Sequence, residues 1–232
     1  MACAPAESRP AVGWHGKLPT LGDFTSRGLD HDFVVVWDEW LSAGLSRLRA
    51  DSPDAWVDAY LASPTWRFVV TPRFLPAPLT TGIWTGVVMP SVDRVGRYYP
   101  LTLAGRLGAI PTRRDRQGTL WSWLQRLQDA AIDALQDDWT VAALDQELLR
   151  LGLPPSDGMD ENGASPPPAA PGAPPDGVLP VSMESFFAAC AHAFAASAAP
   201  GKCIWFTENE FYVPRVLRSD CMDDSIVRLW TV

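Results

Sequence analysis

A proline-rich stretch in the C-terminal half constrains this fold more than any other feature of the sequence. Residues 154–180, PPSDGMDENGASPPPAAPGAPPDGVLP, contain nine prolines and almost no large apolar side chain. Ordering such a backbone costs on the order of 1 kcal/mol per residue, and no apolar burial offsets that cost. We therefore expect a flexible linker or loop there, between a main domain over 12–153 and a C-terminal portion over 181–232. Residues 1–11 are expected to be a flexible N-terminus.

The C-terminal portion is too small to form a core by itself. Its helix-like run SMESFFAACAHAFAA is followed by KCIWFTENEFYVPRVL, a predicted hairpin that turns at Glu208, Asn209 and Glu210. An isolated hairpin is marginally stable in water. We therefore expect this portion to complete the sheet of the main domain, so that the chain forms a single domain interrupted by the proline-rich excursion.

Strand-like runs in the main domain predict an antiparallel sheet. Apolar and polar residues alternate over 12–18, and similar runs bounded by proline or glycine cover 64–72, 82–90 and 97–105. The stretch SVDRVG between the last two runs is short enough to join antiparallel neighbours, with Gly96 available for a positive φ. This pattern predicts a hairpin with Asp93 and Arg94 at its tip.

Helical spacing surrounds these strands. Apolar residues recur at three and four positions over 32–49, 120–137 and 141–151. A shorter helix is predicted from SPDAWVDAYL, with Ser52 as its cap and Pro53 at the first helical position. The fold class that follows is α+β, an α/β sandwich in which helices flank a largely antiparallel central sheet.

Composition narrows the classes of function. The 232 residues are 47% apolar and 20% charged, as in a globular protein, and the formal net charge is −8. No apolar run reaches the ~18 residues of a membrane helix, and no secretory signal is visible, so we expect a cytoplasmic protein without membrane insertion. The negative charge disfavours nucleic acid as a partner.

Catalytic signatures are absent from the sequence. It contains no G-x-S-x-G, H-E-x-x-H or Walker motif and no metal-binding cysteine spacing, and His31 between two aspartates fits a helix start. We therefore expect no enzyme, no metal and no cofactor. The alternative from this class is a small hydrolase or phosphatase-like enzyme that uses His15, Asp23 and Asp93.

Two stiff, charged turns carry the binding hypothesis. They are GKLPTLGDF over 16–24, where Phe24 can plug into the core, and PSVDRVGRYYP over 90–100. Glycine and proline fix their backbones, and arginine suits a carboxylate or phosphate partner. The candidate residues for partner binding are Lys17, Asp23, Asp93, Arg94 and Arg97. The structural alternative is that Lys17 pairs with Asp23 and that Asp93 and Arg97 clip the hairpin together.

Two tryptophans are further candidates. Trp37 and Trp40 are three residues apart and therefore neighbours on the predicted helix. Filling the core is their default role, but tryptophan is also enriched among interface anchors. Both residues are therefore kept as candidates for partner binding.

Four blocks of the sequence together resemble a known family. The blocks GWHGKLPTLGDFTSRGL, WDEWLSAGLS, AYLASPTWRF and GVVMPSVDRVGRYYPLTLA, in this order, resemble the TagF (ImpM-like) proteins of bacterial type VI secretion. The resemblance implies a compact α/β sandwich and a non-catalytic cytoplasmic protein, generally a post-translational repressor, whose partner is the forkhead-associated scaffold protein of the secretion system. Arg27, in the first block, joins the candidate partner-binding residues. A structural accessory of the secretion baseplate is a further alternative.

Overall fold

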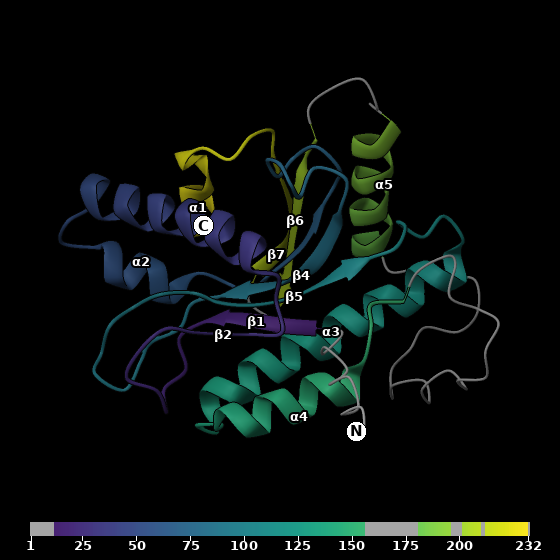
Figure 1. Ribbon diagram of the computed structural model, residues 1–232. Helices are drawn as coiled ribbons and strands as arrows, with labels where there is room; N and C mark the ends of the chain where they lie inside the picture. Colours follow the sequence, from purple (N-terminus) through teal and green to yellow (C-terminus); the bar gives the residue numbers. More distant parts are fainter. Residues whose placement is uncertain (1–11, 156–180, 196–200, 210–211, 232) are drawn as a thin grey trace, which may run out of the picture.

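The structure is a computed structural model, which describes residues 12–155, 181–195, 201–209 and 212–231 (Figure 1). Its strands are β1 Val12–Gly16, β2 Thr25–Arg27, β3 Trp66–Val70, β4 Ile83–Met89, β5 Leu101–Leu107, β6 Cys203–Asn209 and β7 Tyr212–Ser219. Its helices are α1 His31–Asp51, α2 Trp56–Ala62, α3 Arg114–Gln136, α4 Val141–Leu151, α5 Val181–Ala195 and the 3₁₀ helix η1 Asp224–Leu229. The predictions for residues 1–11, for 156–180 and for Glu210 lie outside the described residues.

The strands form one antiparallel sheet. Their order is β2-β1-β5-β4-β3-β6-β7, and each hydrogen-bonded pair is antiparallel. Strand β6 pairs with β3, where Trp205 lies opposite Phe68. The C-terminal hairpin is therefore part of the same sheet as the main strands, and the predicted α+β class is confirmed.

Helices cover both faces of this sheet (Figure 1). Helices α1 and α2 and the 3₁₀ helix pack on one face, and helices α3, α4 and α5 pack on the other. Strand β3 contributes side chains to the core on both faces of the sheet. Trp66, Phe68 and Val70 pack in the core under α1, and Val69 packs in the core under α3. All five residues of β3 are buried, so apolar residues occupy both sides of the strand.

Two local predictions were wrong. Helix α2 begins at Trp56 with Ala55 as its cap, and Ser52 instead ends α1, where its N–H donates to the carbonyl oxygen of Leu48 at 3.0 Å. Strand β5 begins at residue 101, not at 97, so the connection from β4 is a longer loop than the tight hairpin expected. Gly96 in that loop has a φ of +80°, as expected.

Among the described helices, none has the combination of length and apolar character needed to cross a membrane.

Candidate functional site

The two charged turns lie side by side because β1 pairs with β5. His15 lies opposite Thr102 in this pair, which places the end of β1 beside the start of β5. Gly16, at the end of β1, has a φ of +138°, and a Cβ built there would lie 2.1 Å from the carbonyl oxygen of Pro100. Only glycine permits that conformation and that approach. The turn 17–24 therefore begins against the end of the loop 90–100.

Hydrogen bonds join the two turns. The N–H of Arg94 donates to the carbonyl oxygen of Leu21 at 2.9 Å. The hydroxyl of Ser91 donates to the carbonyl oxygen of Lys17 at 2.7 Å. We call this joined pair of segments, 17–24 and 90–100, the clasp.

A buried carboxylate forms the centre of the clasp. The side chain of Asp93 is 0% exposed, and its Oδ2 lies 3.0 Å from the Nζ of Lys17 and 2.7 Å from the Nε of Arg97. Its Oδ1 accepts the backbone N–H groups of Arg97 at 2.9 Å and Val95 at 3.0 Å. Burial raises the pKa of Asp93, but the hydrogen bonds from Arg97, Lys17 and Val95 outweigh burial and hold that pKa well below its usual range.

These contacts decide between the two pairings considered from the sequence. Lys17 pairs with Asp93 and not with Asp23, so this part of the structural alternative was wrong. Asp93 and Arg97 do clip their loop together, as the structural alternative predicted. Arg97 also donates from Nη2 to the carbonyl oxygen of Gly22, so its guanidinium links both segments.

The remaining turn residues lie at the surface. Asp23 accepts the N–H of Phe24 at 2.8 Å, and Arg94 is exposed. Arg27, in β2, pairs with Asp145 of α4 at 2.9 Å. Phe24 is 46% exposed, so the prediction that it plugs into the core was wrong.

Trp37 and Trp40 lie in the core under α1. They are 0% and 3% exposed, and their Nε1 atoms donate to the hydroxyl of Thr102 at 3.0 Å and to the carbonyl oxygen of Asp223 at 2.7 Å. Their rings touch each other with centroids 5.4 Å apart. Neither indole ring is accessible to a partner in this structure.

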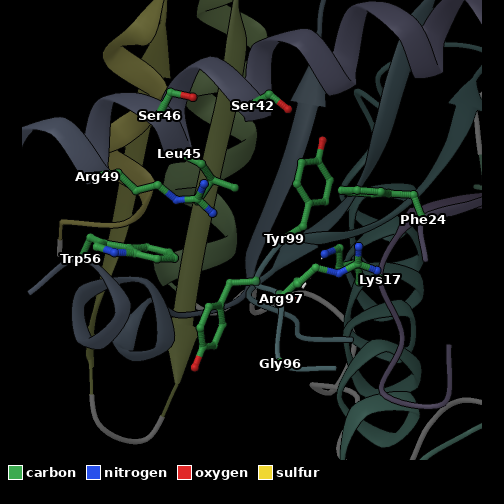
Figure 2. A pocket seen from close by; sticks show the side chains of 11 residues that line it. Lys17, Phe24, Ser42, Leu45, Ser46, Arg49, Trp56, Gly96, Arg97 and Tyr99 are labelled. Atoms are coloured by element: carbon green, nitrogen blue, oxygen red, sulfur yellow. Dashed lines mark hydrogen bonds between the residues drawn. The ribbon is translucent and has the colours of Figure 1, made fainter. Parts of the chain in front are cut away.

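A cleft of about 640 Å³ opens between the clasp and the helices α1 and α2 (Figure 2). One wall comes from the clasp and the other from the helices, and Tyr99 stands between them. The lining residues are Lys17, Phe24, Gly96, Arg97, Tyr98 and Tyr99 from the clasp side, and Ser42, Leu45, Ser46, Arg49 and Trp56 from the helices.

The helical wall carries a residue that the sequence reasoning did not select. The guanidinium of Arg49 lies 4.4 Å above the ring of Trp56, and Trp56 contacts Tyr98 edge to face at 5.6 Å between centroids. Ser42, Ser46 and Arg49 follow one another at intervals of four and three residues and so share one face of α1. In the sequence, these three polar residues follow the buried residues Leu41, Leu45 and Leu48 at the same helical spacing. That pattern could have predicted a polar helix face here.

Each residue of the enzyme alternative has a different partner. His15 lies 3.1 Å from Asp38, whose carboxylate also accepts the hydroxyl of Tyr99 at 2.6 Å. The hydrogen bond with His15 is the main cause that lowers the pKa of Asp38. The carboxylate of Asp93 accepts hydrogen bonds from Lys17, Val95 and Arg97. The carboxylate of Asp23 accepts the backbone N–H of Phe24. Within the described part of the chain, no group of three or more His, Cys, Asp or Glu side chains is arranged to hold a metal ion.

The fold places the chain among α+β proteins in which helices cover both faces of an antiparallel sheet. Residues 13–151 match the profile of the TagF N-terminal domain, type VI secretion system-associated. The match covers more than half of the chain, so the chain belongs to the TagF family and is a type VI secretion system-associated protein. The predicted resemblance is thereby confirmed.

A solved structure supports the same assignment. The crystal structure of PA0076 from Pseudomonas aeruginosa PAO1 is similar to this chain, with 31% sequence identity and a TM-score of 0.66. The similarity covers 95% of this chain and 94% of that one. No significant match was found among curated protein sequences.

Proposed function

We propose that this protein is a non-catalytic cytoplasmic regulator of type VI secretion. In this proposal it binds the forkhead-associated scaffold protein of the secretion system and represses assembly of the machine after translation. The family resemblance motivates the role and the partner. The cleft beside the clasp is the structural observation that supports a binding role.

The chemistry of the cleft favours binding over catalysis. Its lining contains hydroxyl, aromatic and cationic side chains but, among the described residues, no histidine, cysteine or carboxylate. Histidine is the most frequent general acid or base, and a serine nucleophile needs an adjacent base to activate it. Two carboxylates that contact lining residues, Asp93 and Asp38, are engaged by ion pairs and hydrogen bonds.

The rim of the cleft suits a protein partner. Phe24 is 46% exposed and Val95, at the outer end of the clasp, is 64% exposed. Aromatic residues and arginine are enriched in protein interfaces. The clasp is fixed by the two ion pairs of the buried Asp93, so binding there orders little additional backbone.

A pull-down from the native cytoplasm tests this function. The tagged full chain should recover the forkhead-associated scaffold. Arg94 belongs to the clasp but not to the lining of the cleft, so Arg94→Ala tests contact of the partner with the outer surface of the clasp. It should weaken the interaction about thirtyfold, as expected for an arginine worth ~2 kcal/mol at an interface. Arg94 is exposed and its backbone bond to Leu21 remains in the variant, so the fold should be unaffected.

The matched control is Arg113→Ala, which removes an exposed arginine just before α3 on the other face of the sheet. It should leave recovery of the scaffold unchanged. Recovery of no secretion-system protein by the unmodified chain would refute the proposed function.

A further inference from the structure

We propose that the cleft binds an oxyanion, a phosphoryl or carboxylate group, carried on a side chain of the partner protein. Arg49 is the residue that contacts this group, and the hydroxyl of Ser46 is a neighbouring donor. The assignment of the cleft to a protein partner rests on the proposed function, whereas its affinity for an oxyanion does not.

Charge is the first reason. The chain as a whole has a formal net charge of −8. The cleft departs from that balance, because its lining includes Lys17, Arg49 and Arg97 and no carboxylate. Two carboxylates lie behind these three cations: Asp93 pairs with Lys17 and Arg97, and Asp38 accepts the hydroxyl of the lining residue Tyr99. The cleft therefore keeps an excess of positive charge in an acidic protein, which favours an anionic ligand.

The availability of Arg49 is the second reason. Its guanidinium carbon lies over the indole of Trp56, 4.4 Å from the centre of the ring, and this cation–π contact uses the face of the ring and none of the N–H donors. Within the described residues, no hydrogen bond or ion pair engages those donors. Arg47, two positions earlier on α1, differs in that its Nε pairs with Asp51 at 2.8 Å.

The shape of the cleft is the third reason. Ser46 lies on the same wall as Arg49, so a hydroxyl and a forked cation line one cleft, while the hydroxyl of Ser42 is hydrogen-bonded to Tyr99. A phosphoryl or carboxylate group prefers such a set of donors. The volume of about 640 Å³ exceeds the needs of one such group, and Phe24 and Trp56 offer aromatic surface to the rest of the bound segment.

Two small probes test this proposal on the full chain. Phenyl phosphate and benzoate each join a ring to one of the two oxyanions, and their binding can be followed by NMR through the indole N–H of Trp56. At least one probe should shift that signal in a saturable manner at millimolar concentration. Arg49→Ala should weaken the binding at least about tenfold, as for a charge-assisted bond that is lost.

Arg47→Ala is the matched control, because it removes a positive charge from the same exposed helix without touching the cleft. It should change the affinity by less than about twofold. Tighter binding of phenyl phosphate assigns the site to a phosphorylated side chain, and tighter binding of benzoate assigns it to aspartate or glutamate.

Two results would overturn the proposal: no saturable shift with either probe, or equal losses of affinity in Arg49→Ala and Arg47→Ala. The outcome is separable from that of the pull-down. Binding of a probe without recovery of the scaffold refutes the proposed function alone, and recovery of the scaffold without binding of a probe refutes the oxyanion site alone.

Discussion

The two walls of the cleft use the same kinds of side chain for different purposes. In the clasp, Lys17 and Arg97 converge on the buried carboxylate of Asp93, and their charges hold two distant segments of the chain together. On the helical wall, Arg49 rests on Trp56 and its charge faces the cleft. Residue type therefore does not distinguish a structural cation from one that is available to a ligand. The two are distinguished by whether the cation is paired with a carboxylate.

The energetics of the two walls should differ accordingly. Removing one member of a buried ion pair leaves the other charge buried and uncompensated, which destabilises a protein strongly. An exposed cation stacked on an aromatic ring contributes only about 0.5–1 kcal/mol. Substitutions on the clasp should therefore change stability, and substitutions on the helical wall should change binding.

The largest effect is expected where the clasp meets the sheet. Gly16→Ala should lower the free energy of unfolding by about 4 kcal/mol, because a strained backbone and a steric overlap each cost on the order of 1–3 kcal/mol. The new Cβ would overlap the carbonyl oxygen of Pro100, at 2.1 Å. Urea unfolding measures the change.

Gly96→Ala is the control for backbone strain alone, since Gly96 has a φ of +80° but a methyl group added there would meet no atom within 4 Å. This variant should be destabilised by about 1 kcal/mol. Equal losses in the two variants would show that the close approach of the turns does not matter.

A smaller effect is expected at the buried ion pair. Lys17→Met keeps much of the side-chain volume but leaves Asp93 with Arg97 as its only charged partner among the described residues. The melting temperature should fall by several degrees. Arg49→Ala, the loss of a cation from the opposite wall, should change stability by no more than about 1 kcal/mol. The contrast between the walls would be lost if Arg49→Ala were the less stable of the two.

The smallest and most gradual effect is expected with pH. The pKa of Asp93 is lower in the folded chain than in the unfolded chain, where it is about 3.9. Its contribution to stability is therefore fully present above that value and is lost as the pH falls from about 4 toward the folded pKa. Urea midpoints measured from pH 6 to pH 3 should fall more steeply for the unmodified chain than for Asp93→Asn. Parallel curves would mean that Asp93 does not carry this dependence.

Much of the fold followed from local patterns in the sequence. Alternation predicted β1, β3 and β4, and the spacing of Trp37 and Trp40 predicted α1, because these elements each bury a regular set of side chains. The start of β5 was missed because Tyr98 and Tyr99 continue the apolar pattern while belonging to the loop. Their burial comes from contacts with Trp56, Tyr60 and Asp38 and not from the sheet ladder.

The candidate site was harder to predict. The two turns were grouped by their glycines, prolines and charges, and the hydrogen bonds between them show that they are neighbours. The partner of Lys17 was missed because Asp93 is far away in sequence and only the pairing of β1 with β5 brings the two together. Arg49 was missed because a charged residue near the end of an exposed helix is ordinary, and its position over Trp56 depends on the turn between α1 and α2.

The two strands that pair with β3, namely β4 and β6, are synthesised at very different times. Strand β4 follows β3 closely, whereas β6 is made more than one hundred residues later. At about 5–20 residues per second on the ribosome, the interval is on the order of ten seconds. Until β6 arrives, β3 is a free sheet edge, and such an edge is a template for other chains. Newly made copies are therefore most prone to aggregation in the interval after residues 13–151, which match the family, have been made and before β6 has been made.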